Sequence, residues 1–310
     1  MKKKLLTLVL ALTMVLSMSM TAMAATKTET ETFNKKYNTN AVGVYPTETL
    51  SFIVEGNGQG KPIVAVADKE ITGNGELQEI TYTVTTDETT PQGVYEYTIK
   101  EDEGTTAGVT YGEETIKILV MVDNEGKITT GVEKPKNSEK QDTITNTYNV
   151  KNFTVEKEVT GNMSVAEDEF EIVVTLTSDK AVGAKISAAG DEVLPTDWVE
   201  SNGTYTYTKE LTLSASDDAA AFNNIPYGVS VAVVETDTPE NMQGYTNVTS
   251  DTTNFTINAE LTDTEVVITN EKADTIATGI IVNNLPYILV LAGVVIAAVV
   301  LFRRKRYSAM

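Results

Sequence analysis

The feature that most constrains the fold is a series of short segments in which apolar and polar residues alternate. The segments at 80–84 and 115–122 show it clearly, and Asp123-Asn124-Glu125-Gly126 then predicts a tight hairpin turn. Similar segments, rich in Val, Ile, Thr and Tyr, lie at 50–54, 95–99, 170–176, 204–208, 229–234, 254–257 and 265–268. Because no long 3.6-residue period interrupts them, the sequence predicts an all-β sandwich or barrel, with one short helix at 217–222.

The two ends of the chain differ in character from this body. Residues 1–24 combine three lysines, an apolar run and Ala22-Met23-Ala24, which is the pattern of a secretory signal peptide with its cleavage site. Residues 280–302 are almost wholly apolar and precede a basic cluster at 303–306. At about 1.5 Å rise per residue this run can cross a hydrocarbon core of about 30 Å, so we expect a transmembrane helix with a cytoplasmic tail. The ends therefore predict an exported cell-surface protein.

The body contains a divergent internal repeat. Its first copy begins Phe33-Asn34-Lys35-Lys36-Tyr37, and its second begins Val155-Glu156-Lys157-Glu158-Val159. Each copy then has a strand-like segment that ends in a glutamate, Glu101 or Glu235. Each copy closes with Ile-Thr-Asn, and the closing residues are Asn146 and Asn270.

The repeat sets the expected domain boundaries. We expect one domain over 27–149 and a second over 150–272, followed by a C-terminal region over 273–310. The first domain would then end immediately before the second begins, and Asn146 and Lys157 are only eleven positions apart. The last strand of one domain is therefore expected to lead almost directly into the first strand of the next.

Composition excludes several functions. The chain has no cysteine and no histidine, which excludes thiol catalysis, Ser-His-Asp catalysis and the common zinc sites. The formal net charge is −20 although both ends are basic, so the body repels nucleic acid and acidic membranes. We therefore expect no cofactor, no metal and no nucleic-acid partner. Because an exported β protein of this kind could have used disulfides and has none, we look for another type of covalent cross-link.

The repeated Lys, Glu and Asn can form such a cross-link. In a strand, Lys35 and Lys157 share a face with the apolar residues two positions away on either side. A lysine amine in apolar surroundings loses its proton, and a buried glutamate keeps its own. The protonated glutamate then polarises the asparagine amide while the amine attacks, ammonia leaves, and an isopeptide bond forms. In the first copy the adjacent Lys36 is an alternative to Lys35.

These motifs make the chain resemble the two-domain major pilins of Gram-positive bacteria. The resemblance covers nearly the whole mature chain and rests on Phe153-Thr154-Val155-Glu156-Lys157-Glu158-Val159-Thr160-Gly161, on Gly108-Val109-Thr110-Tyr111 and on the order of the repeated motifs. It implies two tandem immunoglobulin-like (CnaB-like) β-sandwiches. It further implies two cross-links, Lys35–Asn146 assisted by Glu101 and Lys157–Asn270 assisted by Glu235.

The resemblance also implies assembly by a sortase, which cuts a Leu-Pro-x-Thr-Gly-like motif before the membrane span. Here that place is held by Thr275-Ile276-Ala277-Thr278-Gly279, in which Thr278-Gly279 fits, the proline is missing and the first position is Thr. A dedicated pilus sortase is therefore expected to join Thr278 to a lysine of the next subunit. Lys134-Pro135-Lys136-Asn137 is similar to the family's acceptor motif, which favours Lys136 over Lys134 and Lys140.

The expected function is that of a structural pilus subunit on the cell surface, not of an enzyme with turnover. Its expected partners are identical subunits joined head to tail, a pilus-specific sortase, and minor pilins or a tip adhesin. The C-terminal helix would hold it in the membrane before sorting. One alternative is a minor or anchoring pilin, or a single-copy wall- or membrane-anchored adhesin with the same domains. A surface enzyme is the other alternative, and the lack of histidine and cysteine argues against it.

Overall fold

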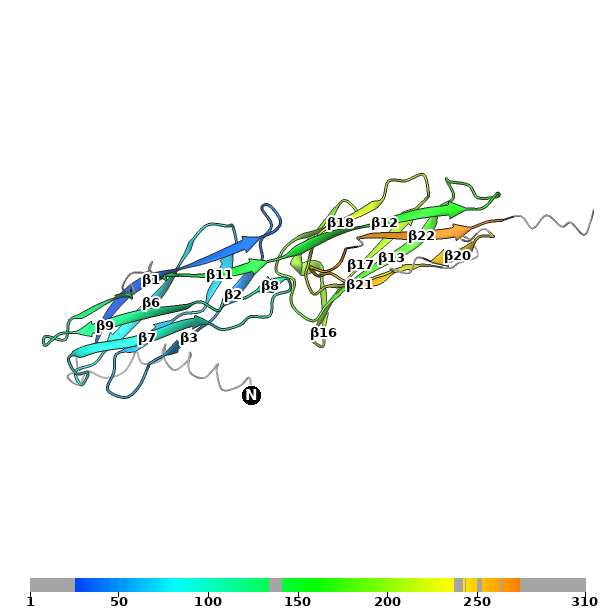
Figure 1. The fold of residues 1–310 in the computed structure, drawn as a ribbon. Helices are drawn as coiled ribbons and strands as arrows, with labels where there is room; N and C mark the ends of the chain where they lie inside the picture. The colour runs from blue at the N-terminus through cyan, green and yellow to red at the C-terminus, as the bar shows by residue number, and fades with distance from the viewer. Residues whose placement is uncertain are drawn as a thin grey trace, which may run out of the picture.

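The computed structural model describes residues 26–133, 141–236, 242, 244–249, 253–262 and 264–273. These residues form two β-sandwiches placed end to end in an elongated molecule (Figure 1). The predicted signal peptide at 1–24 and the apolar run at 280–302 lie outside the described residues. Among the residues described, no helix is long and apolar enough to span a membrane.

The first sandwich is built from residues before Asn149. Its larger sheet has the strand order β4 (Ile63–Val66), β6 (Gln78–Thr86), β1 (Lys27–Thr39), β11 (Thr143–Tyr148), β8 (Val109–Thr110). The facing sheet has the order β10 (Ile128–Val132), β9 (Thr115–Val122), β7 (Gly93–Glu101), β3 (Phe52–Glu55). A separate ribbon pairs β2 (Thr47–Leu50) with β5 (Lys69–Thr72).

The second sandwich repeats this plan with larger sheets. One sheet has the order β15 (Asp191–Val193), β14 (Ile186–Ala188), β18 (Ala220–Pro226), β12 (Val150–Thr160), β22 (Glu265–Glu271), β20 (Thr246–Thr249). The other has the order β16 (Val199–Ser201), β17 (Thr204–Leu213), β13 (Phe170–Ser178), β19 (Ser230–Glu235), β21 (Asn254–Thr256). A short 3-10 helix, η1 (Pro195–Asp197), precedes β16.

In each sandwich the first and last strands are parallel neighbours. Strand β1 pairs with β11 so that Tyr37 lies opposite Asn146, and β12 pairs with β22 so that Val159 lies opposite Asn270. In both pairs the residue opposite the asparagine comes two positions after the lysine. Because side chains alternate between the faces of a strand, the lysine and the asparagine point to the same face, one diagonal step apart.

Alternation also explains the two cores. Along β1 the buried residues are Phe33, Lys35 and Tyr37, while the residues between them are partly exposed.

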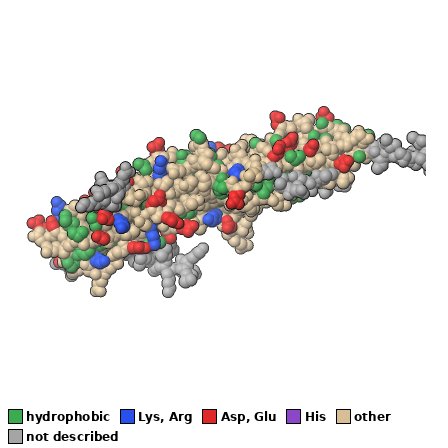
Figure 2. Space-filling model, in the orientation of Figure 1, with side chains coloured by type: hydrophobic (Ala, Val, Ile, Leu, Met, Phe, Trp, Pro, Cys, Tyr) green, Lys and Arg blue, Asp and Glu red, His purple; other side chains and the backbone are tan. Residues whose placement is uncertain are grey.

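The predicted strand at 115–122 is β9, and its turn closes with Gly126 at a φ of 70°. Acidic side chains are scattered along the outer surface of both sandwiches (Figure 2).

The helix predicted at 217–222 is wrong. The Ser214 backbone N–H donates to the Asp217 carboxylate at 2.7 Å, so this segment forms a turn. Strand β18 then begins at Ala220 and pairs with β12. The sheet partner therefore overrides the helical preference of three successive alanines.

Backbone hydrogen bonds join the two sandwiches. Thr47 N donates to Gly183 O at 2.8 Å, and Ala107 N donates to Ala181 O at 2.8 Å. Ala184 packs into the first core and Ala107 into the second, so each sandwich inserts a small residue into its neighbour. A Cβ at Gly183 would lie 2.9 Å from Thr47 O, which explains why glycine occupies this contact.

Candidate isopeptide sites

The first candidate site lies between the two sheets of the first sandwich. Lys35 comes from β1, Asn146 from β11 and Glu101 from the end of β7 on the facing sheet. Lys35 and Asn146 are fully buried, and the Glu101 side chain is 1 % exposed. Lys36, the alternative lysine, is only partly buried and lies on the opposite face of β1.

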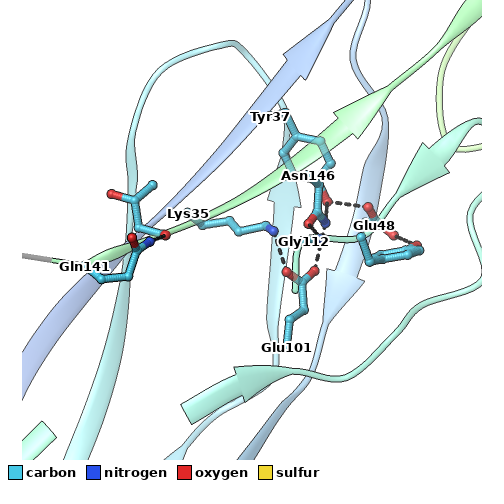
Figure 3. A network of polar contacts seen from close by, with 9 residues as sticks. Lys35, Tyr37, Glu48, Glu101, Gly112, Gln141 and Asn146 are labelled. Carbon is cyan, nitrogen blue, oxygen red and sulfur yellow. Dashed lines mark hydrogen bonds and ion pairs between the residues drawn. The ribbon is translucent and has the colours of Figure 1, made fainter. Parts of the chain in front are cut away.

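Glu101 bridges the other two residues. Its Oε2 pairs with Lys35 Nζ, and its Oε1 accepts a hydrogen bond from Asn146 Nδ2 at 2.8 Å (Figure 3). On the other side of the amide, the Gly112 N–H donates to Asn146 Oδ1 at 2.9 Å. The amide thus has its nitrogen toward the carboxyl and its oxygen toward a backbone donor.

Burial favours the neutral forms of both titrating groups in this site. It lowers the pKa of Lys35, against the attraction of Glu101. It raises the pKa of Glu101, against the attraction of Lys35 and its hydrogen bonds. A neutral amine beside a protonated carboxyl is the arrangement that nucleophilic attack on an amide requires.

Sequence reasoning missed two side chains next to this site. Tyr37 receives a hydrogen bond from Asn146 Nδ2 at 3.4 Å and donates its own proton to Glu48, a buried carboxylate on β2. The sequence could have indicated Tyr37, because it lies two positions after Lys35 and shares its face. Glu48 gave no signal, because the chain contains 44 acidic residues and nothing local distinguishes this one.

The second candidate site uses the equivalent strands. Lys157 comes from β12, Asn270 from β22 and Glu235 from the end of β19. All three are buried. Glu235 Oε2 lies 3.4 Å from Lys157 Nζ, and Glu235 Oε1 accepts a hydrogen bond from Asn270 Nδ2 at 2.6 Å. The carboxyl therefore lies between lysine and asparagine, but its Oε2 makes no hydrogen bond to Lys157.

The surroundings of the second site differ from those of the first. Lys157 Nζ donates to Ile268 O at 3.0 Å and lies 4.3 Å from the centre of the Phe170 ring. Burial lowers the pKa of Lys157, against the attraction of Glu235. Asn270 Nδ2 faces Met242 Sδ at 4.0 Å, and Asn270 Oδ1 has no hydrogen-bond partner within the described part of the chain.

The residues expected to act in polymerisation lie outside the described residues. These are Thr278 and Gly279 as donor, and Lys134, Lys136 and Lys140 as acceptors. Within the described ranges there is no group of three or more His, Cys, Asp or Glu side chains that could hold a metal ion.

Residues 11–149 match the model of a family described as Spy0128-like isopeptide containing domain, and residues 151–272 match a family described as a domain of unknown function. No curated protein matches.

Solved structures that match this chain include two major pilins of Streptococcus pyogenes. One is 19 % identical, covers 79 % of this chain and 99 % of its own, and has a TM-score of 0.46. The other, T-13, is 17 % identical, with 80 % and 99 % covered and a TM-score of 0.49. A pilus-presented adhesin, Spy0125 (Cpa), is 9 % identical, with 78 % and 99 % covered and a TM-score of 0.32.

Proposed function

We propose that this chain, whose residues 11–149 match the family described as Spy0128-like isopeptide containing domain, is a structural subunit of a sortase-assembled covalent pilus of a Gram-positive bacterium. One observation carries the proposal. Both sandwiches bury a lysine, a glutamate and an asparagine where the first and last strands lie side by side. Each trio forms one isopeptide bond without an enzyme or a cofactor.

In the first sandwich the bond forms between Lys35 Nζ and Asn146 Cγ, and the Cγ–Nδ2 bond of Asn146 breaks. The proton lost by the amine passes through Glu101 to the departing nitrogen, which leaves as ammonia. Glu101 suits this shuttle because one of its oxygens contacts the amine and the other contacts the amide nitrogen. The Gly112 N–H faces the amide oxygen, where negative charge develops during the attack.

In the second sandwich Lys157, Glu235 and Asn270 take the same roles. The Lys157 amine attacks Asn270 Cγ, and Glu235 carries the proton from Lys157 Nζ to Asn270 Nδ2. The folded sheets hold the three groups together, so proximity supplies much of the acceleration. The reaction occurs once in each sandwich, so the chain is a structural protein and its chemistry has no turnover.

The position of the bonds suggests a mechanical role for the immunoglobulin-like (CnaB-like) sandwiches. With Lys136 as the acceptor, tension on the fibre enters the first sandwich shortly before its last strand in the sequence, passes into the second sandwich through its first strand and leaves through its last. In both sandwiches the first and last strands are parallel neighbours, and the proposed bond joins them directly. Most of the chain between lysine and asparagine then carries little force, which makes the fibre inextensible and suited to adhesion.

Polymerisation is proposed from sequence motifs outside the described residues. After export by the signal peptide, a pilus-specific sortase cuts between Thr278 and Gly279 and joins Thr278 to a lysine of the next subunit, with Lys136 favoured over Lys134 and Lys140. Substitution of Thr278 by Ala is then expected to abolish the ladder of covalent polymers on denaturing gels. The second candidate function, a minor pilin or single-copy adhesin with the same sandwiches, predicts no ladder in the wild type.

Single-molecule pulling between Lys27 and Lys272 tests the mechanical role. Wild type is expected to show no unfolding step below the force that breaks covalent bonds. Lys157→Ala is expected to show one long step, because about 110 residues are released at up to about 3.3–3.6 Å each. The exposed Lys185, which pairs with Glu192 in the same sandwich, supplies the control variant Lys185→Ala. A wild type that unravels in two long steps contradicts the proposal.

A further inference from the structure

We propose that Tyr37 is a further catalytic residue of the first cross-link, and that Glu48 is the residue that positions it. This inference rests on the proposed isopeptide chemistry and adds to it a second side chain that contacts the leaving nitrogen. Tyr37 touches the nitrogen that leaves as ammonia, on the side of the amide away from Glu101 (Figure 3). The trio of lysine, glutamate and asparagine is therefore not the whole of the first site.

The direction of the hydrogen bonds defines the role of Tyr37. A phenol has one proton to donate, and Tyr37 donates it to Glu48 Oε1. The oxygen of Tyr37 consequently presents lone pairs to Asn146 and accepts from its Nδ2 at 3.4 Å. If the amide were flipped, its carbonyl oxygen would meet those lone pairs and the Gly112 N–H would meet an NH2 group. Only one orientation of the amide satisfies both neighbours.

This orientation is the one the reaction needs. With one N–H of Asn146 held by Tyr37 and the other by Glu101, the lone pair that develops on the nitrogen during attack stays within reach of the Glu101 proton. The oxygen stays on the Gly112 N–H. Tyr37 therefore helps the nitrogen to receive its proton and to depart as ammonia, while the overall exchange of bonds is unchanged.

Hydrogen bonds from neighbouring side chains fix the position of the Glu48 carboxylate. Its second oxygen, Oε2, accepts hydrogen bonds from Thr106 Oγ1 at 2.8 Å and from Tyr111 Oη at 2.5 Å. Three donors converge on this one buried carboxylate, so it remains an acceptor for Tyr37. Burial, together with the Glu48 charge, raises the pKa of Tyr37, which keeps the proton on its hydroxyl.

Among the described residues of the second sandwich, no equivalent of the Tyr37–Glu48 pair contacts the asparagine. Where Tyr37 contacts Asn146, Asn270 meets the sulfur of Met242, which is a weak acceptor. Tyr37 should therefore affect the rate of the first cross-link only. The second cross-link, formed in the same molecule, is the internal reference for any experiment on Tyr37.

The test follows both cross-links in the full chain during cell-free synthesis. Samples are stopped in acid at set times and digested, and mass spectrometry gives the linked fraction of each lysine–asparagine peptide pair. Tyr37→Phe is expected to slow the Lys35–Asn146 link about tenfold, the effect of losing one ordinary hydrogen bond in the transition state. The Lys157–Asn270 link should change less than about twofold.

Tyr148→Phe is the matched control, because Tyr148 is also fully buried in the first sandwich but its hydroxyl has no hydrogen-bond partner within the described residues. It should leave both rates unchanged. Glu48→Gln should slow the first link, because a glutamine cannot accept from all three hydroxyls at once. Added to Tyr37→Phe it should slow the link no further, since Glu48 acts through the Tyr37 hydroxyl. A merely structural Glu48 would instead add its own effect.

Each outcome decides the matter. An unchanged rate in Tyr37→Phe overturns the inference while leaving the proposed cross-link intact. If Tyr37→Phe does not fold, Glu48→Gln gives the answer with the tyrosine in place, and an unchanged first link there is equally contrary. A wild type without the Lys35–Asn146 link overturns this inference together with the proposed function.

Discussion

The two candidate sites share a trio and differ in what surrounds it. In the first, the Asn146 amide is held by Glu101, Tyr37 and the Gly112 N–H. In the second, the described partners of the Asn270 amide are Glu235 and the sulfur of Met242. Lysine, glutamate and asparagine on equivalent strands are thus the constant part of the design. The groups around the amide vary, and we expect them to set the rate of each cross-link.

Removal of either glutamate should have the largest effect on the proposed cross-links. Glu101→Ala and Glu235→Ala should each suppress the link of their own sandwich by about 10²–10⁴-fold in rate, the usual contribution of general acid–base catalysis. The residual rate should be higher for Glu101→Ala, because Gly112 and Tyr37 still hold the amide. The linked fraction of each peptide pair, measured against time, gives both values.

The exposed Glu103, two positions after Glu101, provides the control variant Glu103→Ala. It should leave both links intact. Loss of both links in either single glutamate variant would show that the two sandwiches do not react independently, contrary to the mechanism proposed for each trio.

The two cross-links should contribute similar free energies to the stability of their sandwiches. Lys35 and Asn146 enclose about as many residues as Lys157 and Asn270, roughly 110 in each case. By analogy with disulfides, closing such a loop stabilises the folded state by about 4.7 kcal/mol in the chain-entropy model. Asn146→Ala and Asn270→Ala should each lower the Tm of the affected sandwich by at least roughly 10 °C without loss of fold. Calorimetry measures both, and a variant that melts like wild type would mean that its sandwich carries no bond.

The rate of the first link should depend on pH through both of its titrating groups. The amine must be neutral, and burial lowers the pKa of Lys35, so the rate rises with pH through a value below the ordinary lysine pKa of about 10.4. Glu101 must be protonated, and burial raises its pKa, so the rate falls again at higher pH. The profile of the first link is therefore bell-shaped.

The second link shares the acid limb, because burial lowers the pKa of Lys157 as well. Linked fractions of both pairs from cell-free synthesis across a pH series give the two profiles in one experiment. A first link whose rate climbs steadily up to the pKa of a free lysine would remove the buried pair from the mechanism.

Much of the fold was predictable from the sequence. Alternation located strands such as β9, and the shared face of Phe33, Lys35 and Tyr37 predicted that the lysine points inward. The resemblance to Gram-positive pilins with isopeptide domains is confirmed by the family match over residues 11–149. The parallel pairing of β1 with β11 was not predictable from alternation, because it joins strands more than a hundred residues apart.

The rest of the first site depends on similar long-range contacts. Glu48 reaches Tyr37 only because β2 folds back beside the site, and nothing in its local sequence marks it. The Gly112 N–H faces Asn146 because the chain passes close to β11, where a Cβ at Gly112 would collide with Thr145 O. The domain boundaries and the roles of the cross-link residues stay predictions.

Peptide mapping of the purified full chain can detect both proposed cross-links. Proteolysis followed by mass spectrometry should yield two branched peptide pairs, one joining Lys35 to Asn146 and the other joining Lys157 to Asn270. Each pair should be lighter by one ammonia, about 17 Da, than the sum of its two peptides, as amide exchange requires. Recovery of linear peptides with unmodified Asn146 and Asn270 would contradict the proposed cross-links.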